Sequence, residues 1–376
     1  MNARERYVET LLFGKPDKVP LTPGGPRDST RRKWETQGLA EGDKWHQTLW
    51  DMLGLQPEST QVHVPVGADF KIIPQFEEKV IEHKDGHYIV QDWMGAITEI
   101  SDEFDYTYIR QARDFVTRKW HRFPVLNPQD FEERIKWRYN VDAPGRFPAD
   151  FDERARALKE RDYPVSVSID GPFWQLREWV GMENLCIFMA EQPDWVMEMC
   201  NFWGDFVYDM LDRILDKIQL DSVHFSEDMA YKEHPMISPA MTRKFLLPQY
   251  LRWVGLIKSK GCPIVDMDSD GRIDLLIPIW IEAGINVCDP IEVAAGNDIV
   301  EFRRRFGKKM GYTGGIDKRA IAAGGDVMRQ EVLRVVPPLL VDGGFIPSCD
   351  HGVPPDISWP NFIEYTKLLA QLTGWL

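Results

Sequence analysis

Three aspartates at alternate positions are the most distinctive chemical feature of the sequence. Asp266, Asp268 and Asp270 follow the apolar run "CPIV". In an extended chain, residues two apart point to the same side, so these three carboxylates would face one region of space. Carboxylates held a few ångströms apart must bind a cation, share a proton or find basic partners. The spacing therefore predicts either a metal site or a metal-free polar network.

A calcium loop is a poorer explanation of the same residues. "DMDSDGRIDLLI" has Asp and Gly at several EF-hand positions, but its last position holds Ile277 where a bidentate Glu is needed. The residues before it are strand-like and include Pro263, whereas an EF-hand requires a helix there. The sequence therefore disfavours this class of site.

Acidic residues also follow other apolar, β-branched runs. Glu227 and Asp228 end "VHFSED", and His351 follows "FIPSCD". Further acids in equivalent places are Asp170, Asp289, Glu292, Asp317 and Asp350. For Asp289 and Asp317 the expected role is a helix N-cap. Two carboxylates of the aspartate-rich stretch and the His351 imidazole would make a workable set of ligands for Zn²⁺ or a similar ion.

The elements that must position these residues alternate regularly from Tyr163 onward. Short runs such as "YPVSVSID", "SVHF" and "CPIVD" are each followed by a helical pattern, which predicts a parallel sheet. No G-x-G-x-x-G turn follows a strand, as it would in a dinucleotide-binding sheet. We therefore expect an α/β fold, a (β/α)8 TIM barrel formed by residues 1–376 as a single domain, with its chemistry at the carboxyl ends of the strands.

Two further elements are expected before that repeat. Residues 1 to about 60 have the pattern of N-terminal helices broken by Pro and Gly. Near residues 77–100, two extended runs around Asp85-Gly86 predict a β-hairpin insertion.

Composition disfavours several classes of function. The formal net charge of −14 opposes binding to nucleic acid or to an anionic membrane surface. The N-terminal residues lack a signal-peptide pattern and no segment has about twenty consecutive apolar residues, so we expect a soluble, cytoplasmic protein without membrane association. The five cysteines form no C-x-x-C pair, which indicates reduced thiols. Arg27 and Arg31 lie in the locally basic segment "GGPRDSTRRKW", either at a solvated helix start or in an anion site.

Over most of its length the sequence resembles the uroporphyrinogen decarboxylase superfamily, which includes the haem-pathway decarboxylase and corrinoid-dependent methyltransferases. The segments that carry this resemblance are "GADFKIIPQFEEKV", "IDGPFWQLREWVG", "DSDG", "GYTGGID" and "DHGVPPDISWPNFIEY". The last is similar to the H-G-x-x-P-D segment with the family's active-site histidine, whose place His351 takes. Asp69 takes the place of the essential aspartate that binds pyrrole NH groups. The resemblance implies a (β/α)8 barrel.

Two departures argue against a true uroporphyrinogen decarboxylase. The R-Q-A-G-R signature that binds substrate carboxylates is missing, so only Arg27 or Arg31 could stand in for it. The family's tyrosine has no counterpart between Gly171 and Gly181. The methyltransferase-like branch is therefore the nearer resemblance.

That branch typically holds zinc through H-x-C and a later Cys. Aligned on the glycine that follows, these positions fall on Asp268, Asp270 and His351. Some relatives that demethylate methoxylated aromatics use Glu and His ligands in place of Cys. The resemblance thus implies a divalent metal, expected to be Zn²⁺, on these three residues. Glu227 is a fourth candidate ligand, and Cys349 is a backup ligand only.

The resemblance implies a metal-dependent methyltransferase that demethylates a methoxylated or methylated small molecule. The corrinoid acceptor would be carried by a partner protein, since the chain has no D-x-H-x-x-G motif, and the family commonly forms dimers, which makes a homodimer one expected state. The implied catalytic residues are Asp69, Glu227, Asp228 and His351. The implied substrate-binding residues are Arg27, Arg31, Trp174, Arg177 and Trp179. For the two tryptophans, packing within the fold is the alternative role.

Two other functions stay open at this level. One is a metal-free decarboxylase of a non-porphyrin or tetrapyrrole acid, in which Asp69 stabilises a protonated intermediate, Arg27 or Arg31 holds a carboxylate and His351 moves a proton. The other is a non-catalytic barrel that binds a corrinoid or a tetrapyrrole.

Overall fold

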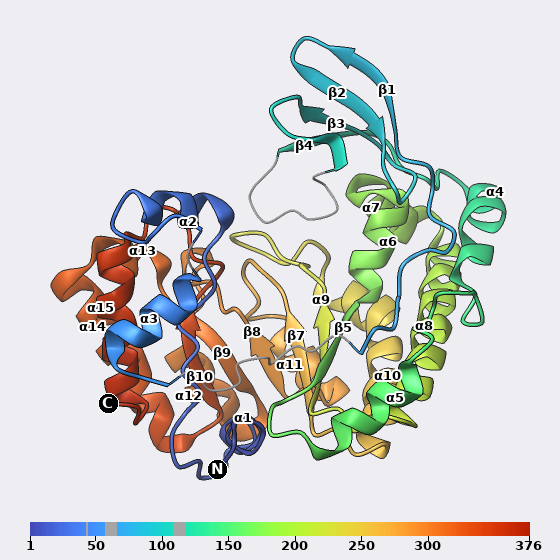
Figure 1. Ribbon diagram of the computed structural model, residues 1–376. Coiled ribbons are helices and arrows are strands. Elements are labelled where there is room, and N and C mark those ends of the chain that lie inside the picture. The colour runs from blue at the N-terminus through green and yellow to red at the C-terminus, as the bar shows by residue number, and fades with distance from the viewer. Residues whose placement is uncertain (43, 57–65, 108–116) are drawn as a thin grey trace.

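The computed structural model describes residues 1–42, 44–56, 66–107 and 117–376 (Figure 1). Its first helices are α1 (Ala3–Leu11), α2 (Asp28–Glu35) and α3 (Trp45–Leu53). The Asn2 side chain caps α1 by accepting a hydrogen bond from the Glu5 N–H, and the Glu5 carboxylate accepts one from the Asn2 N–H. The expected N-terminal helices are confirmed.

The central sheet of the described chain has six parallel strands in the order β10-β9-β8-β7-β6-β5. Each strand is a short run rich in apolar residues, and helices lie between successive strands, as βαβ units require. The predicted α/β class is therefore confirmed. The strands are β5 (Ser166–Asp170), β6 (Ser222–Ser226), β7 (Ile264–Asp268), β8 (Val287–Asp289), β9 (Gly311–Ile316) and β10 (Phe345–Cys349).

Helices pack around this sheet, with those between β5 and β7 mostly on the right of Figure 1 and those between β9 and the C-terminus on the left. Within the described ranges, no helix combines the length and the apolar character needed to cross a membrane. The helices from β5 onward are α6 (Pro172–Val180), α7 (Met182–Glu191), α8 (Pro193–Leu215), α9 (Pro239–Met241), α10 (Leu247–Ser259), α11 (Ile277–Ala283), α12 (Ile299–Phe306), α13 (Lys318–Ala323), α14 (Gly325–Asp342) and α15 (Trp359–Leu372).

A closed eight-stranded barrel is not confirmed by the strand pairing, since the described sheet ends at β5 and β10. The segment before α2 does run beside β10. The Cys349 N–H donates to the Pro23 carbonyl (3.3 Å), and the Val353 N–H donates to the Gly25 carbonyl (2.9 Å). The sheet is thus extended by an irregular segment at this edge, and the barrel stays a prediction.

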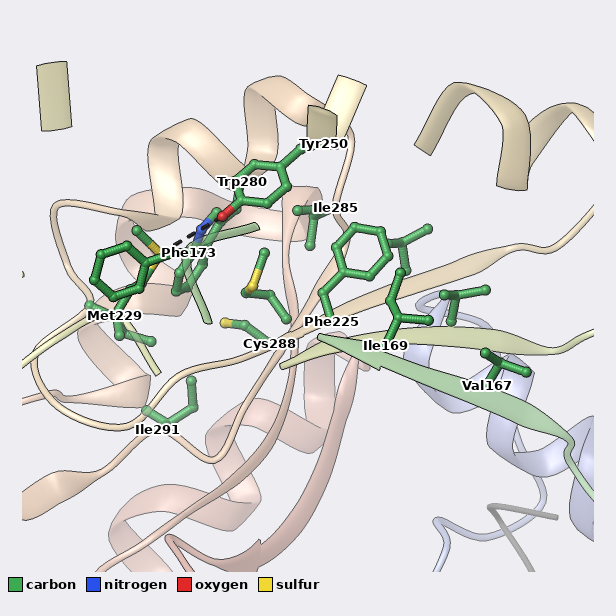
Figure 2. Close-up of a cluster of buried hydrophobic side chains, with 14 of the residues drawn as sticks. Val167, Ile169, Phe173, Phe225, Met229, Tyr250, Trp280, Ile285, Cys288 and Ile291 are labelled. Atoms are coloured by element: carbon green, nitrogen blue, oxygen red, sulfur yellow. Dashed lines mark hydrogen bonds between the residues drawn. The ribbon is translucent and has the colours of Figure 1, made fainter. Parts of the chain in front are cut away.

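The two faces of the sheet differ in polarity, because side chains alternate along each strand. Figure 2 shows apolar side chains that point from the strands toward the helices, among them Ile169, Phe225 and Cys288. Phe173 of α6 and Tyr250 of α10 lie in the same cluster. The intervening positions place polar side chains on the opposite, inner face. This face carries the residues that could do chemistry.

A separate antiparallel sheet has the order β1-β2-β3-β4 (Figure 1). Its first hairpin turns at Asp85 and Gly86, which both have positive φ (52° and 77°), as the common two-residue hairpin turn requires. The hairpin prediction is confirmed, but the insertion extends beyond residue 100 to a fourth strand. The strands are β1 (Lys79–Lys84), β2 (His87–Gln91), β3 (Ile97–Ser101) and β4 (Arg118–Arg122).

The polar stretch between residues 128 and 161 forms short helical pieces. It contains α4 (Pro128–Asp130), α5 (Phe151–Ala157) and single turns of π and 3₁₀ helix between and after them.

Candidate functional site

His351 and Asp270 meet beyond the carboxyl ends of two strands. Asp270 lies two residues after β7, and His351 lies two residues after β10. The His351 Nε2 is 2.9 Å from the Asp270 Oδ2. The other ring nitrogen, Nδ1, is 3.0 Å from the Arg27 Nη2. Three of the predicted site residues therefore form one hydrogen-bonded chain.

The Arg27 contact defines where the proton sits on the His351 ring. A guanidinium only donates hydrogen bonds, so Nδ1 accepts here and the proton lies on Nε2, which donates to Asp270. The Asp270 hydrogen bond raises the pKa of His351, while burial and the charges of Lys318 and Arg27 oppose that rise. In this arrangement the imidazole is neutral and is aligned for proton exchange with Asp270.

Two carboxyl groups directly after β6 hold protons more tightly than usual. Glu227 is completely buried, and its carboxyl group accepts hydrogen bonds from the Trp174 N–H (2.9 Å) and from the Tyr250 hydroxyl. Burial raises the pKa of Glu227 to about 7 and that of Asp228 to about 6. Both groups can therefore carry a proton near neutral pH, the range that suits general acid–base chemistry.

Asp228 also contacts the hydrogen-bonded residues Arg27, His351 and Asp270, through the backbone of Asp270. It has a φ of 41°, in the left-handed region that Asp tolerates better than most residues, and this turns the chain after β6. Its Oδ1 accepts a hydrogen bond from the Asp270 N–H (3.0 Å). The Arg177 guanidinium donates to the Asp228 carbonyl (2.9 Å) and lies over the Trp174 ring at 4.4 Å. Arg177 thus positions the Asp228 loop.

A second polar cluster lies on the inner face of the strands. Within the described residues, His224 of β6, Asp266 of β7 and Asp289 of β8 offer ligand atoms that all lie within 4.8 Å of one another. The His224 Nδ1 is 2.9 Å from the Asp266 Oδ2, and its Nε2 is 3.8 Å from the Asp268 Oδ2. An imidazole and two carboxylates at this spacing could hold a divalent metal.

The electrostatics of this inner cluster reflect its burial. Burial and then the Asp266 charge raise the pKa of Asp289 well above its usual range. Burial lowers the pKa of His224, but the charge and hydrogen bond of Asp266 outweigh it and raise that pKa well above its usual range. The cluster therefore holds either protons or another positive charge.

The N-cap prediction was wrong for Asp289 and is confirmed for Asp317. Asp289 ends β8, where its Oδ1 is buried without a hydrogen-bond partner. Asp317 caps α13 and accepts a hydrogen bond from the Arg319 N–H (2.8 Å). Sequence reasoning also missed His224. Its signal was present in the two-residue alternation of "SVHFS", but its pairing opposite Asp266 depends on the strand register.

The predicted metal ligands do not meet as a set. In the part of the chain that the structure describes, the ligand atoms of Asp268, Asp270 and His351 do not gather within 4.8 Å of one another. A metal on the His351 Nε2 would remove the ring proton while Arg27 still required the Nδ1 lone pair, which would leave an imidazolate. Ligating histidines ordinarily donate the other ring N–H to an acceptor. The hydrogen bonding at His351 therefore fits a proton-transfer group better than a metal ligand.

Two cavities are lined by candidate site residues. The first, of about 670 Å³, is lined by His224, Asp266 and Asp289 together with apolar side chains such as Tyr7 and Ile346. The second, of about 580 Å³, lies between β5, α6 and residues 68–72. The inner cluster thus faces open volume.

The second cavity brings together several of the predicted substrate-site residues. Asp69, Trp174 and Trp179 line it, and the Asp69 Oδ1 accepts a hydrogen bond from the Lys71 N–H (2.8 Å). Trp179 is only 3% exposed and packs against the rings of neighbouring aromatic residues, so it also has the core role. Arg31, by contrast, is exposed on α2, one turn beyond the His351 contact made by Arg27.

Comparison with known proteins gives a family and a shared fold. A family model described as uroporphyrinogen decarboxylase (URO-D) matches residues 121–370. A methyltransferase from Methanosarcina mazei superposes with a TM-score of 0.55 at 13% identity, covering 100% of this chain and 98% of that one. A protein described as a vitamin-B12-independent methionine synthase from Listeria monocytogenes aligns with a TM-score of 0.36 at 10% identity, over 60% of this chain and 68% of that one. No curated protein matches the chain.

Proposed function

This chain belongs to the uroporphyrinogen decarboxylase (URO-D) family, and we propose that it is a methyltransferase that demethylates a methoxylated or methylated small molecule. The observation that supports this most is the chain of Arg27, His351 and Asp270 beside Asp228, whose pKa is raised to about 6. The fold shared with the Methanosarcina methyltransferase agrees with the proposal.

Demethylation of a methoxy group requires help for the oxygen that departs. When the methyl–oxygen bond breaks, the oxygen keeps the bonding electrons and needs a proton or a cation. Asp228 is suited to deliver that proton, because it retains one up to about pH 6 and is only partly buried. His351 and Asp270 would position the reacting oxygen and replace the proton on Asp228.

A metal and a corrinoid complete the proposed reaction. A divalent cation, expected to be Zn²⁺, would supply Lewis-acid assistance at the same oxygen. The methyl group would pass to a corrinoid carried by a partner protein. The strand-end set of Asp268, Asp270 and His351 stays a prediction for the metal.

The second cavity favours an aromatic substrate. Trp174 offers a half-buried ring surface in it, and Asp69 offers a hydrogen-bond acceptor. A methoxylated aromatic compound would use both features. We therefore place this class of substrate first.

The direct test is methyl transfer to free cob(I)alamin from a panel of methoxylated aromatics and methylated amines, followed by the absorbance of methylcobalamin. Turnover with one member of the panel, lost in D270N and retained in D317N, would support the proposal. Tight binding of cobalamin without turnover on any member would favour a non-catalytic barrel instead.

One observation favours decarboxylation as the second candidate. Arg27 lies beside the proton-bearing His351, so one residue could hold a substrate carboxylate while the other protonates the carbon that loses it. Release of CO₂ from an aromatic or pyrrole carboxylic acid by metal-free enzyme would support this reaction and exclude a metal requirement.

A further inference from the structure

We propose that His224, Asp266 and Asp289 bind a divalent cation on the inner face of the sheet. This inner site, rather than the strand-end set, would hold the metal on which the proposed methyl transfer depends. The inference takes its catalytic meaning from the proposed function, but cation binding can be measured without any substrate.

The inner cluster has more negative charge than its one imidazole can balance. Asp266 and Asp268 lie 2.9 and 3.8 Å from His224, and Asp289 offers a ligand atom within 4.8 Å of it. The Asp289 Oδ1 is buried without a hydrogen-bond partner. Buried polar atoms normally have a partner, and a binding site for an ion is one recognised reason for an exception. A bound cation would supply both the charge and the partner.

The His224 ring has the hydrogen bonding of a metal ligand. Its Nδ1 lies 2.9 Å from the Asp266 carboxylate and can donate to it, so Nε2 is the nitrogen that would face a metal. This carboxylate–histidine pairing commonly supports metal-bound imidazoles. The Nε2 faces Asp268 at 3.8 Å, so a cation beside it would meet a further carboxylate. His351 has the opposite arrangement, with a guanidinium on its second nitrogen.

The strands hold these ligands in a fixed arrangement. Parallel pairing sets His224 opposite Asp266 and sets Asp268 opposite Asp289. Ligands of Zn²⁺ lie about 2.0–2.2 Å from the ion, so atoms already within 4.8 Å of one another need only small shifts to share one.

The cavity in front of the cluster leaves room for the ion and its open coordination positions. The lining of the same cavity includes Tyr7 and Ile346, which belong to an apolar cluster against the strands. This cluster consists of Tyr7, Leu11, Ile264, Val287 and Ile346. The site would therefore be open toward a partly apolar cavity, and a catalytic metal site requires such an open position.

The experiment measures metal content by plasma mass spectrometry, together with titration by Co²⁺ followed by visible absorption. H224Q and D289N test the inner site, D270N and H351Q test the strand-end set, and D317N controls for the loss of one carboxylate. We expect about one equivalent of metal per chain in the wild type, D270N, H351Q and D317N, and a loss of at least tenfold in H224Q and D289N.

Misfolding is separated from loss of the site by circular dichroism and thermal unfolding without metal. Because D289N keeps the size of the side chain, it should be about as stable as the wild type in the metal-free state. Metal retained by H224Q and D289N but lost from D270N and H351Q would overturn the inference. Failure of the wild type to bind Zn²⁺ or Co²⁺ would also overturn it, in favour of a protonated network. Metal binding without methyl transfer would refute only the proposed function.

Discussion

The His351 Nε2 and the Asp270 Oδ2 lie 2.9 Å apart although 81 residues separate them in the chain. Their strands, β10 and β7, are separated in the sheet by β9 and β8. In a flat sheet, three strand spacings would place these strands about 14 Å apart. Both residues lie two positions past their strands, so the segments that follow β7 and β10 bring the two side chains together.

Removing either member of this pair should impair turnover far more than stability. We expect D270N and H351Q to lower kcat by about 100-fold or more, as loss of a proton-transfer group typically does. Both side chains lie past the strand ends, so the free energy of unfolding should change by less than about 1 kcal/mol. Steady-state kinetics and urea unfolding measure the two effects. D317N, with the same charge change as D270N, should remain active. Equal losses of kcat in D270N, H351Q and D317N would contradict the assignment.

Arg27 should act on the titration of His351, and Arg31 should not. The Arg27 charge lowers the pKa of His351, so R27Q should raise that pKa above its wild-type value. Nitrogen chemical shifts of the imidazole, followed against pH by NMR, report this change directly. R31Q alters an exposed arginine on α2, the helix that begins directly after Arg27, and serves as the matched control. An unchanged or lowered pKa in R27Q would contradict the hydrogen-bonded chain.

Glu227 should make the protein less stable as the pH rises. Its pKa is about 7 in the folded protein against an ordinary 4.5, so between these values the folded state binds more protons than the unfolded state. Stability is therefore lost as pH rises through this window, by on the order of 3 kcal/mol. E227Q should lose less stability than the wild type between pH 5 and pH 8 in urea unfolding. E183Q, on the exposed surface of α7, should follow the wild type.

The two tryptophans of the second cavity should separate into a packing role and a binding role. W179A removes a buried ring and should cost about 3–5 kcal/mol of stability. W174A removes a half-buried ring and should weaken substrate binding about tenfold at a smaller cost in stability. Calorimetric unfolding and KM measured on the same preparations test the distinction. A larger stability loss in W174A would reverse the assignment.

Features that depend on local sequence patterns could be predicted, whereas features that depend on contacts between distant residues could not. The alternation of strands and helices and the turn at Asp85-Gly86 depend on local patterns, and both are present in the structure. β4 was missed because "RKWHR" is mostly charged and exposed. The inner cluster was missed because the pairing of His224 with Asp266 depends on strand register, which a single sequence does not reveal.

The site formed by Arg27, His351 and Asp270 was likewise only partly predictable from the sequence. The histidine and its aspartate could be identified as candidates, since each follows a recognisable strand. The choice between Arg27 and Arg31 could not be made, because the contact that decides it joins residues 324 positions apart. Tertiary structure thus supplied the partner and, through it, the proton position on the ring.

The most direct test of the central claim is the fate of a labelled methyl group. A substrate from the panel, carrying ¹³C in its methyl group, is incubated in a single turnover with enzyme and cob(I)alamin, and the products are followed by ¹³C NMR. We predict that the label appears in methylcobalamin while the demethylated compound accumulates in equal amount. A label that stays on the substrate while CO₂ is released from its ring would contradict methyl transfer.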